Sequence, residues 1–97
     1  MKIRVKELSS FWEKTKGLIG DNTGIPVFFR TRWGIHTFGV SKTIAVAILD
    51  DVNKVVQIKQ LSPNRVFFWN PLYSRVLEIP DEYSLEKPKI GESVELI

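Results

Sequence analysis

The 97-residue chain contains no cysteine and only one histidine. Without cysteine it can form no disulfide, no thiolate metal site and no thiol nucleophile, so its stability has to come from packing. One histidine among scattered carboxylates also lacks the ligand number and spacing that zinc or iron sites require. We therefore expect neither a metal nor a cofactor.

Long apolar segments are also missing. No run approaches the roughly 20 residues that span a membrane, and the first six residues alternate charged with apolar side chains, unlike a signal peptide. The chain has neither the Gly-rich loop of dinucleotide sites nor the nucleophile elbow of hydrolases. We expect a cytoplasmic protein without a membrane partner, and we assign no catalytic residue.

The residues that are present favour one compact domain over residues 1–97. Apolar residues make up 43% of the chain and aromatic residues 11%, which is enough to offset the entropic cost of folding. The net charge of +3 is mild for a nucleic-acid-binding protein. It would favour polyanions if the excess positive charge lay on one face.

One short amphipathic helix is predicted near the N-terminus. Apolar residues recur every three or four positions from Leu8 to Ile19, and Ser10 with Glu13 forms a capping-box pattern. A single helical turn is also expected over residues 81–87.

The rest of the chain predicts about seven short strands. Ile44–Leu49 is apolar or small throughout and is expected to be a central strand covered on both faces. Val27–Phe29 and residues 35–40 are expected to form a hairpin. The other strand-like segments are 2–6, 55–59, 66–69, 73–79 and 90–97. Together they predict a mainly β (α+β) fold, a small antiparallel barrel or sandwich with the helix packed over one opening.

Several short segments follow one another in an order that resembles a known family. They are Lys16–Gly20, Val27–Phe29, His36–Phe38, Ala47–Asp50, Val55–Ile58, Leu61–Pro63, Val76–Ile79 and Ile90–Leu96. In this order they resemble the domain of unknown function 192, an uncharacterised prokaryotic family, over about residues 10–96. The resemblance implies a single compact domain of mainly β structure with no assigned reaction.

The chain also departs from the family pattern. Phe38–Thr43 reads Phe-Gly-Val-Ser-Lys-Thr where the family usually reads Phe-Trp-Met-Lys-Asn-Thr, and Ile44-Ala45 replaces Leu-Asp. Pro80-Asp81 stands in place of Ala-Gly. The resemblance therefore implies a divergent member in which any pocket of the family is altered.

The leading functional prediction is a binding or interaction module. Arg30, Arg32 and Trp33 lie in a loop between two expected strands, close to His36, and are predicted to contact a protein partner or a small anionic ligand. Strand alternation places Glu78 at the rim of the core, where it would anchor a ligand, pair with an arginine or accept hydrogen bonds from backbone amides. His36 is alternatively a strand residue satisfied by one backbone partner.

Two other functions remain open. Single-stranded nucleic acid could bind to a second set of cations among aromatic residues, although alternation turns about half of those aromatics toward the core. That set is Arg65, Phe67, Trp69, Tyr73 and Arg75. An enzyme using His36 and Glu78 would require the two side chains to meet in an open cleft.

Overall fold

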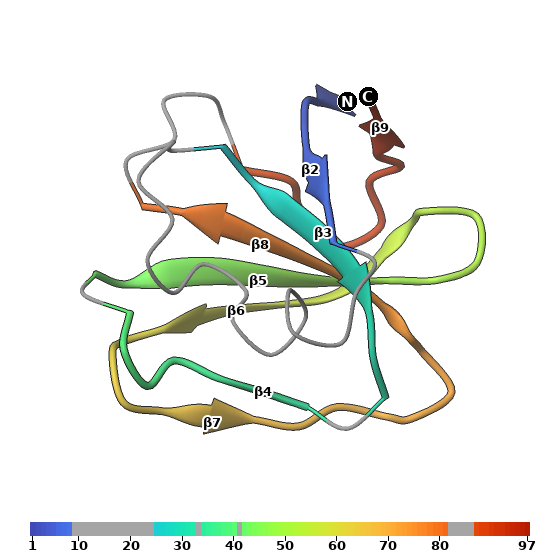
Figure 1. Cartoon of the computed structure of the whole chain (residues 1–97). Helices are drawn as coiled ribbons and strands as arrows, with labels where there is room; N and C mark the ends of the chain where they lie inside the picture. The colour runs from blue at the N-terminus through green and yellow to red at the C-terminus, as the bar shows by residue number, and fades with distance from the viewer. Residues whose placement is uncertain (9–24, 33, 41, 82–86) are drawn as a thin grey trace.

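The computed structural model describes residues 1–8, 25–32, 34–40, 42–81 and 87–97 (Figure 1). These residues form nine strands and no helix, which confirms the mainly β prediction, but the strands do not close into a barrel. The predicted N-terminal helix lies almost wholly in residues 9–24 and the predicted helical turn in 82–86, both outside the described residues. Within the described part of the chain, no helix is long and apolar enough to cross a membrane.

The main sheet has five strands in the order β2-β3-β8-β5-β6 (Figure 1). Their bounds are Lys6–Glu7 for β2, Val27–Arg30 for β3, Arg75–Pro80 for β8, Ile44–Leu49 for β5 and Val55–Leu61 for β6. All neighbours are antiparallel except β2 and β3, which are parallel. β5 lies between two strands and is buried at all six positions, as the unbroken apolar run predicts.

Two short ribbons complete the molecule. β4 (Ile35–His36) pairs with β7 (Val66–Phe67) in antiparallel fashion, and β1 (Lys2–Ile3) pairs in parallel with β9 (Glu95–Leu96). We call the first pair the β4–β7 ribbon and the second the terminal ribbon.

The five-stranded sheet has a hydrophobic core on each face, because alternate residues of a strand point to opposite sides. On β3, Val27 and Phe29 belong to one core and Phe28 to the other. The ribbon-side core consists of Leu8, Val27, Phe29, Ile44, Val46, Ile48, Leu61, Phe67, Trp69 and Val76. The terminal-side core consists of Ile3, Phe28, Ala45, Ala47, Leu49, Val55, Leu77, Ile79 and Val94. Each ribbon thus contributes to the core on one face of the sheet.

The predicted hairpin between Val27–Phe29 and residues 35–40 is wrong. β3 pairs with β2 and β8, whereas β4 pairs with β7. β4 is also shorter than predicted, because the chain turns directly after it: Val40 N–H donates to Thr37 O at 3.1 Å, and Gly39 has a φ of +87°. A positive φ at the third residue of a turn suits glycine, so the turn ends the strand.

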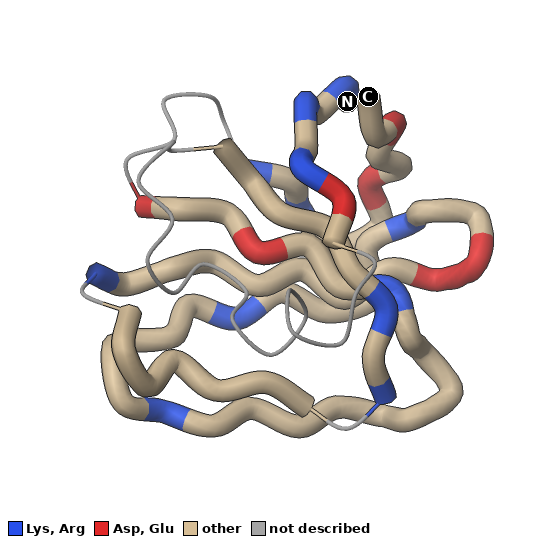
Figure 2. The backbone as a smooth tube through the Cα atoms, in the orientation of Figure 1, with Lys and Arg blue, Asp and Glu red and all other residues tan. Residues whose placement is uncertain are grey.

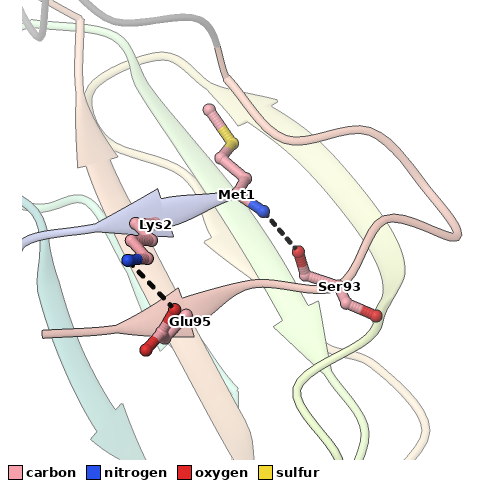
Figure 3. Close-up of polar contacts among 4 residues, drawn as sticks. All are labelled: Met1, Lys2, Ser93 and Glu95. Atoms are coloured by element: carbon pink, nitrogen blue, oxygen red, sulfur yellow. Dashed lines mark hydrogen bonds and ion pairs between the residues drawn. The ribbon is translucent and has the colours of Figure 1, made fainter.

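The terminal ribbon carries polar contacts at its solvent-exposed edge (Figure 3). The amino group of Met1 donates to Ser93 O at 3.0 Å. Lys2 Nζ lies 4.0 Å from the Glu95 carboxylate, with both side chains largely exposed. Exposed ion pairs of this kind contribute little stability, so the ribbon is held mainly by its backbone hydrogen bonds and by Ile3 in the core.

Candidate functional site

The β4–β7 ribbon has one buried face and one exposed face. Ile35 and Phe67 lie opposite each other and pack into the ribbon-side core, whereas His36 and Val66 lie opposite each other and are exposed. Alternation along both strands produces this division. We call the exposed side, with the flanking residues Phe38 and Phe68, the outer face of the ribbon.

Phe68 provides a broad aromatic surface on this outer face. A Cβ atom added to Gly34 would lie only 2.5 Å from Phe68 Cδ1, so the ring covers the glycine on the neighbouring strand. The Phe68 side chain is nevertheless 69% exposed. The Cδ1–Cε1 edge of the ring therefore lies against Gly34, while most of the Phe68 surface is open to solvent.

His36 and Phe38 form a second aromatic surface beside it. Their ring centroids are 5.3 Å apart with an interplanar angle of 29°, and Phe38 is 51% exposed. His36 Nδ1 accepts the Phe38 N–H at 3.2 Å, which places the proton of the neutral imidazole on Nε2. The hydrogen bond orients the ring and supplies the backbone partner considered for this histidine.

Thr37 holds this end of the ribbon in place through buried hydrogen bonds. Its side chain is fully buried; Oγ1 donates to Ser62 O at 2.7 Å and accepts Arg65 N–H at 2.8 Å. Thr37 N–H also donates to Arg65 O at 2.8 Å. The exposed rings are therefore carried by a backbone that is tied into the fold, as a preformed binding surface requires.

Arginines lie at both ends of the ribbon. Arg32 Nε donates to Pro71 O at 3.0 Å at one end, and Arg65 pairs with Thr37 at the other, with both arginine side chains exposed. Next to Pro71, Leu72 is 79% exposed.

Negative charge is absent from this region. The sequence contains no Asp or Glu over residues 25–49 or 52–77, which include both ribbon strands. Figure 2 shows this distribution, with blue near each end of the ribbon and no red along β4 or β7. Among the residues that the structure describes, the outer face therefore combines aromatic and apolar side chains with cations and no carboxylate.

Glu78 lies elsewhere, in the interior. It is 3% exposed, on β8 between Val27 of β3 and Val46 of β5. Alternation correctly places it on the face shared with Val76, but its predicted position at the rim is wrong, because both faces of the sheet are covered. Glu78 is thus buried within the sheet, whereas the imidazole of His36 is exposed on the outer face of the ribbon.

Two of the aromatic residues in the predicted nucleic-acid set are buried. Phe67 and Trp69 are each 9% exposed, and their ring centroids lie 5.6 Å apart within the ribbon-side core. Trp69 Nε1 donates to Tyr73 O at 2.8 Å, and Tyr73 packs partly buried against the same core. The predicted set contains the inward-facing Phe67 and Trp69, whereas the alternate residues Val66 and Phe68 are the exposed ones.

The remaining predicted residues divide between structural and surface positions. Arg75 has a structural role, since its guanidinium lies 4.8 Å from the Phe28 ring centroid and its Nε donates to Asn53 Oδ1 at 2.7 Å. Arg30 is exposed at the end of β3, opposite Arg75 in the register. Trp33 lies outside the described residues.

No group of three or more histidine and carboxylate side chains among the described residues could hold a metal ion. Comparison with known protein families, with curated proteins and with solved structures found no match to this chain. The outer face of the β4–β7 ribbon is accordingly selected as the candidate site on geometry and charge.

Proposed function

We propose that this protein is a small binding module that holds an extended anionic partner across the outer face of the β4–β7 ribbon. The observation that carries the proposal is the row of exposed side chains formed by Phe38, His36, Val66 and Phe68. A protein gains no folding stability by leaving such side chains in water, and contiguous exposed apolar surface is characteristic of interaction sites.

The charge of the region supports an anionic partner. Arg32 and Arg65 flank the row, and the surrounding sequence contains no carboxylate that would repel such a partner. A surface with charge of one sign raises the association rate with ligands of the opposite sign. A partner that reaches from Arg32 to Arg65 must be extended, because it has to cross the whole ribbon.

The proposal includes two expectations from the sequence. The ordered segments support divergent membership of the domain of unknown function 192 family, which has no assigned reaction and so agrees with binding rather than catalysis. The cysteine-free composition supports a location in the reducing cytoplasm.

The proposal can be tested by titrating the isotopically labelled protein with inorganic polyphosphate at low ionic strength and following backbone amide chemical shifts. We expect the shifts to be concentrated at Gly34–Phe38 and Val66–Phe68. An Arg32→Ala/Arg65→Ala double variant should bind several-fold more weakly, because two cations at the ends of the surface are lost.

The matched control is Lys2→Ala/Lys54→Ala, which removes the same charge from exposed positions outside the β4–β7 ribbon. This variant should keep most of the affinity. Equal weakening in both double variants, or no binding of polyphosphate and of oligonucleotides alike, would contradict the proposal.

A further inference from the structure

We infer that the extended anionic partner is single-stranded nucleic acid, whose bases stack on Phe68 and on the His36–Phe38 pair while its phosphates contact Arg32 and Arg65. The inference rests on the proposed function, because it identifies the partner of the same surface. It also replaces the set of aromatic residues that the sequence predicted for this activity.

The orientation of Phe68 is the first argument. Its Cδ1–Cε1 edge lies against Gly34, where a Cβ would collide with the ring, and 69% of the residue surface stays exposed to solvent. An open aromatic face is a stacking site for another planar group, and every nucleobase offers such a face. Polyphosphate and acidic peptides carry anionic charge but no planar bases, so they cannot make full use of the aromatic stacking site.

The second argument is the spacing of the aromatic surfaces. His36 lies opposite Val66, and Phe68 follows Val66 by two residues on the same strand face. His36 and Phe68 are therefore diagonal neighbours, which lie about 7–8 Å apart, so the two surfaces are about one extended nucleotide step apart. Successive unpaired bases can reach both, whereas paired bases in a duplex are stacked on each other and hide their faces.

The third argument is the position of the cations. Arg32 uses Nε to reach Pro71 O, which leaves its terminal Nη groups to contact phosphate. The Arg65 backbone is tied to Thr37 by hydrogen bonds, so its exposed side chain starts from a fixed position. Aromatic surfaces flanked by arginines are the combination with which proteins bind single strands without reading their sequence.

The test measures binding of a fluorescently labelled oligothymidylate by anisotropy at low salt. The comparison ligands are an abasic oligonucleotide of the same length, a duplex of the same length, an acidic peptide and vesicles containing anionic lipid. We expect the oligothymidylate to bind about tenfold more tightly than the abasic strand, because stacking contributes about 1–3 kcal/mol per base. Its affinity should also fall steeply as salt is raised.

Variants separate stacking from general adhesion. Phe68→Leu and Phe38→Leu keep an apolar side chain but remove the plane, and each should weaken oligothymidylate binding about fivefold or more while leaving abasic-strand binding nearly unchanged. Val52→Ala, at an exposed apolar position in the β5–β6 turn, is the matched control and should bind normally. If Phe68→Leu fails to fold by circular dichroism, Phe38→Leu still decides the result.

Equal affinity for oligothymidylate and the abasic strand would overturn the inference and leave the proposed function standing. Tighter binding to the duplex, the acidic peptide or the vesicles would also overturn it. Failure to bind any of these anionic ligands would contradict both the inference and the proposed function.

Discussion

Thr37 shows how one polar residue can determine the position of a surface. Its hydroxyl is fully buried, yet it donates one hydrogen bond to Ser62 O and accepts another from Arg65 N–H. The turn that follows β4 and the chain that enters β7 are therefore joined through a single side chain. Any change at this oxygen acts on both strands of the ribbon.

Replacing Thr37 by valine should lower the free energy of unfolding by about 1–3 kcal/mol, because the Arg65 N–H and Ser62 carbonyl lose their partner in a buried position. Thr37→Ser keeps the hydroxyl and loses only a methyl group, so it should cost distinctly less. Urea unfolding followed by circular dichroism measures both values. A serine variant as unstable as the valine variant would show that packing, rather than hydrogen bonding, dominates at this site.

At the same scale, the sequence predicts the direction of a side chain better than its exposure. Alternation along β8 places Glu78 on the same face as Val76, which is correct, but a strand pattern does not reveal that both faces of its sheet are covered. The same limit applies to Phe67 and Phe68. Alternation predicts that the two side chains point in opposite directions, but it does not show which of them is exposed to solvent, because that depends on the core against which the ribbon packs.

The β4–β7 ribbon is the element in which the proposed binding surface and the folding stability are most closely connected. Its strands are only two residues long, so one steric clash that a substitution introduces between them disturbs a large share of the ribbon. Gly34, directly before β4, lies close to the β7 backbone, since an added Cβ would also lie 2.7 Å from Phe67 O.

Gly34→Ala should destabilise the protein distinctly more than Gly91→Ala. The two glycines have nearly equal φ angles of +88° and +89°, so each alanine has a backbone cost of about 1 kcal/mol or more. Only the Gly34 variant meets neighbouring atoms, whereas the Cβ at position 91 would have no contact within 4 Å. Thermal unfolding of the two variants provides the comparison, and equal midpoints would show that the ribbon adjusts without cost.

Elements differ in how far the sequence determines them. The apolar run Ile44–Leu49 identifies a central strand without further information, and the turn after it is set by Asp50, whose Oδ1 accepts N–H groups from Val52 and Lys54. The pairing of β4 with β7 could not be predicted in this way, because the paired residues are 30 and 32 positions apart in the chain. The residues between β3 and β4 also resemble an ordinary hairpin loop.

At the scale of the whole molecule, the two cores are connected because they share strands. Val46 and Ala47 are adjacent on β5 but belong to opposite cores, and Val76 and Leu77 on β8 do the same. Loss of β5 or β8 would open both cores at once, so we expect the two cores to lose their structure together on thermal or chemical unfolding.

The protein should therefore unfold in one cooperative transition. Val94→Ala in the terminal-side core should lower the free energy of unfolding by about 2 kcal/mol. The unfolding midpoint reported by the fluorescence of Trp69, in the ribbon-side core, should then fall to the same value as the midpoint reported by circular dichroism. Replacing Trp12 and Trp33 by phenylalanine makes Trp69 the sole tryptophan, whose fluorescence is excited selectively at wavelengths that tyrosine does not absorb. Separate midpoints for the two signals would show that the cores unfold independently.

The parallel terminal ribbon has a mechanical consequence. β1 and β9 run in the same direction, and their backbones are joined by hydrogen bonds from Glu95 N–H to Met1 O, from Ile97 N–H to Ile3 O and from Val5 N–H to Ile97 O. A force that pulls Met1 and Ile97 apart acts along the strands and shears these bonds together, whereas antiparallel terminal strands would open one bond at a time. Stretching the molecule between its two ends must therefore break the whole ribbon in a single step before the sheet beneath it is disturbed.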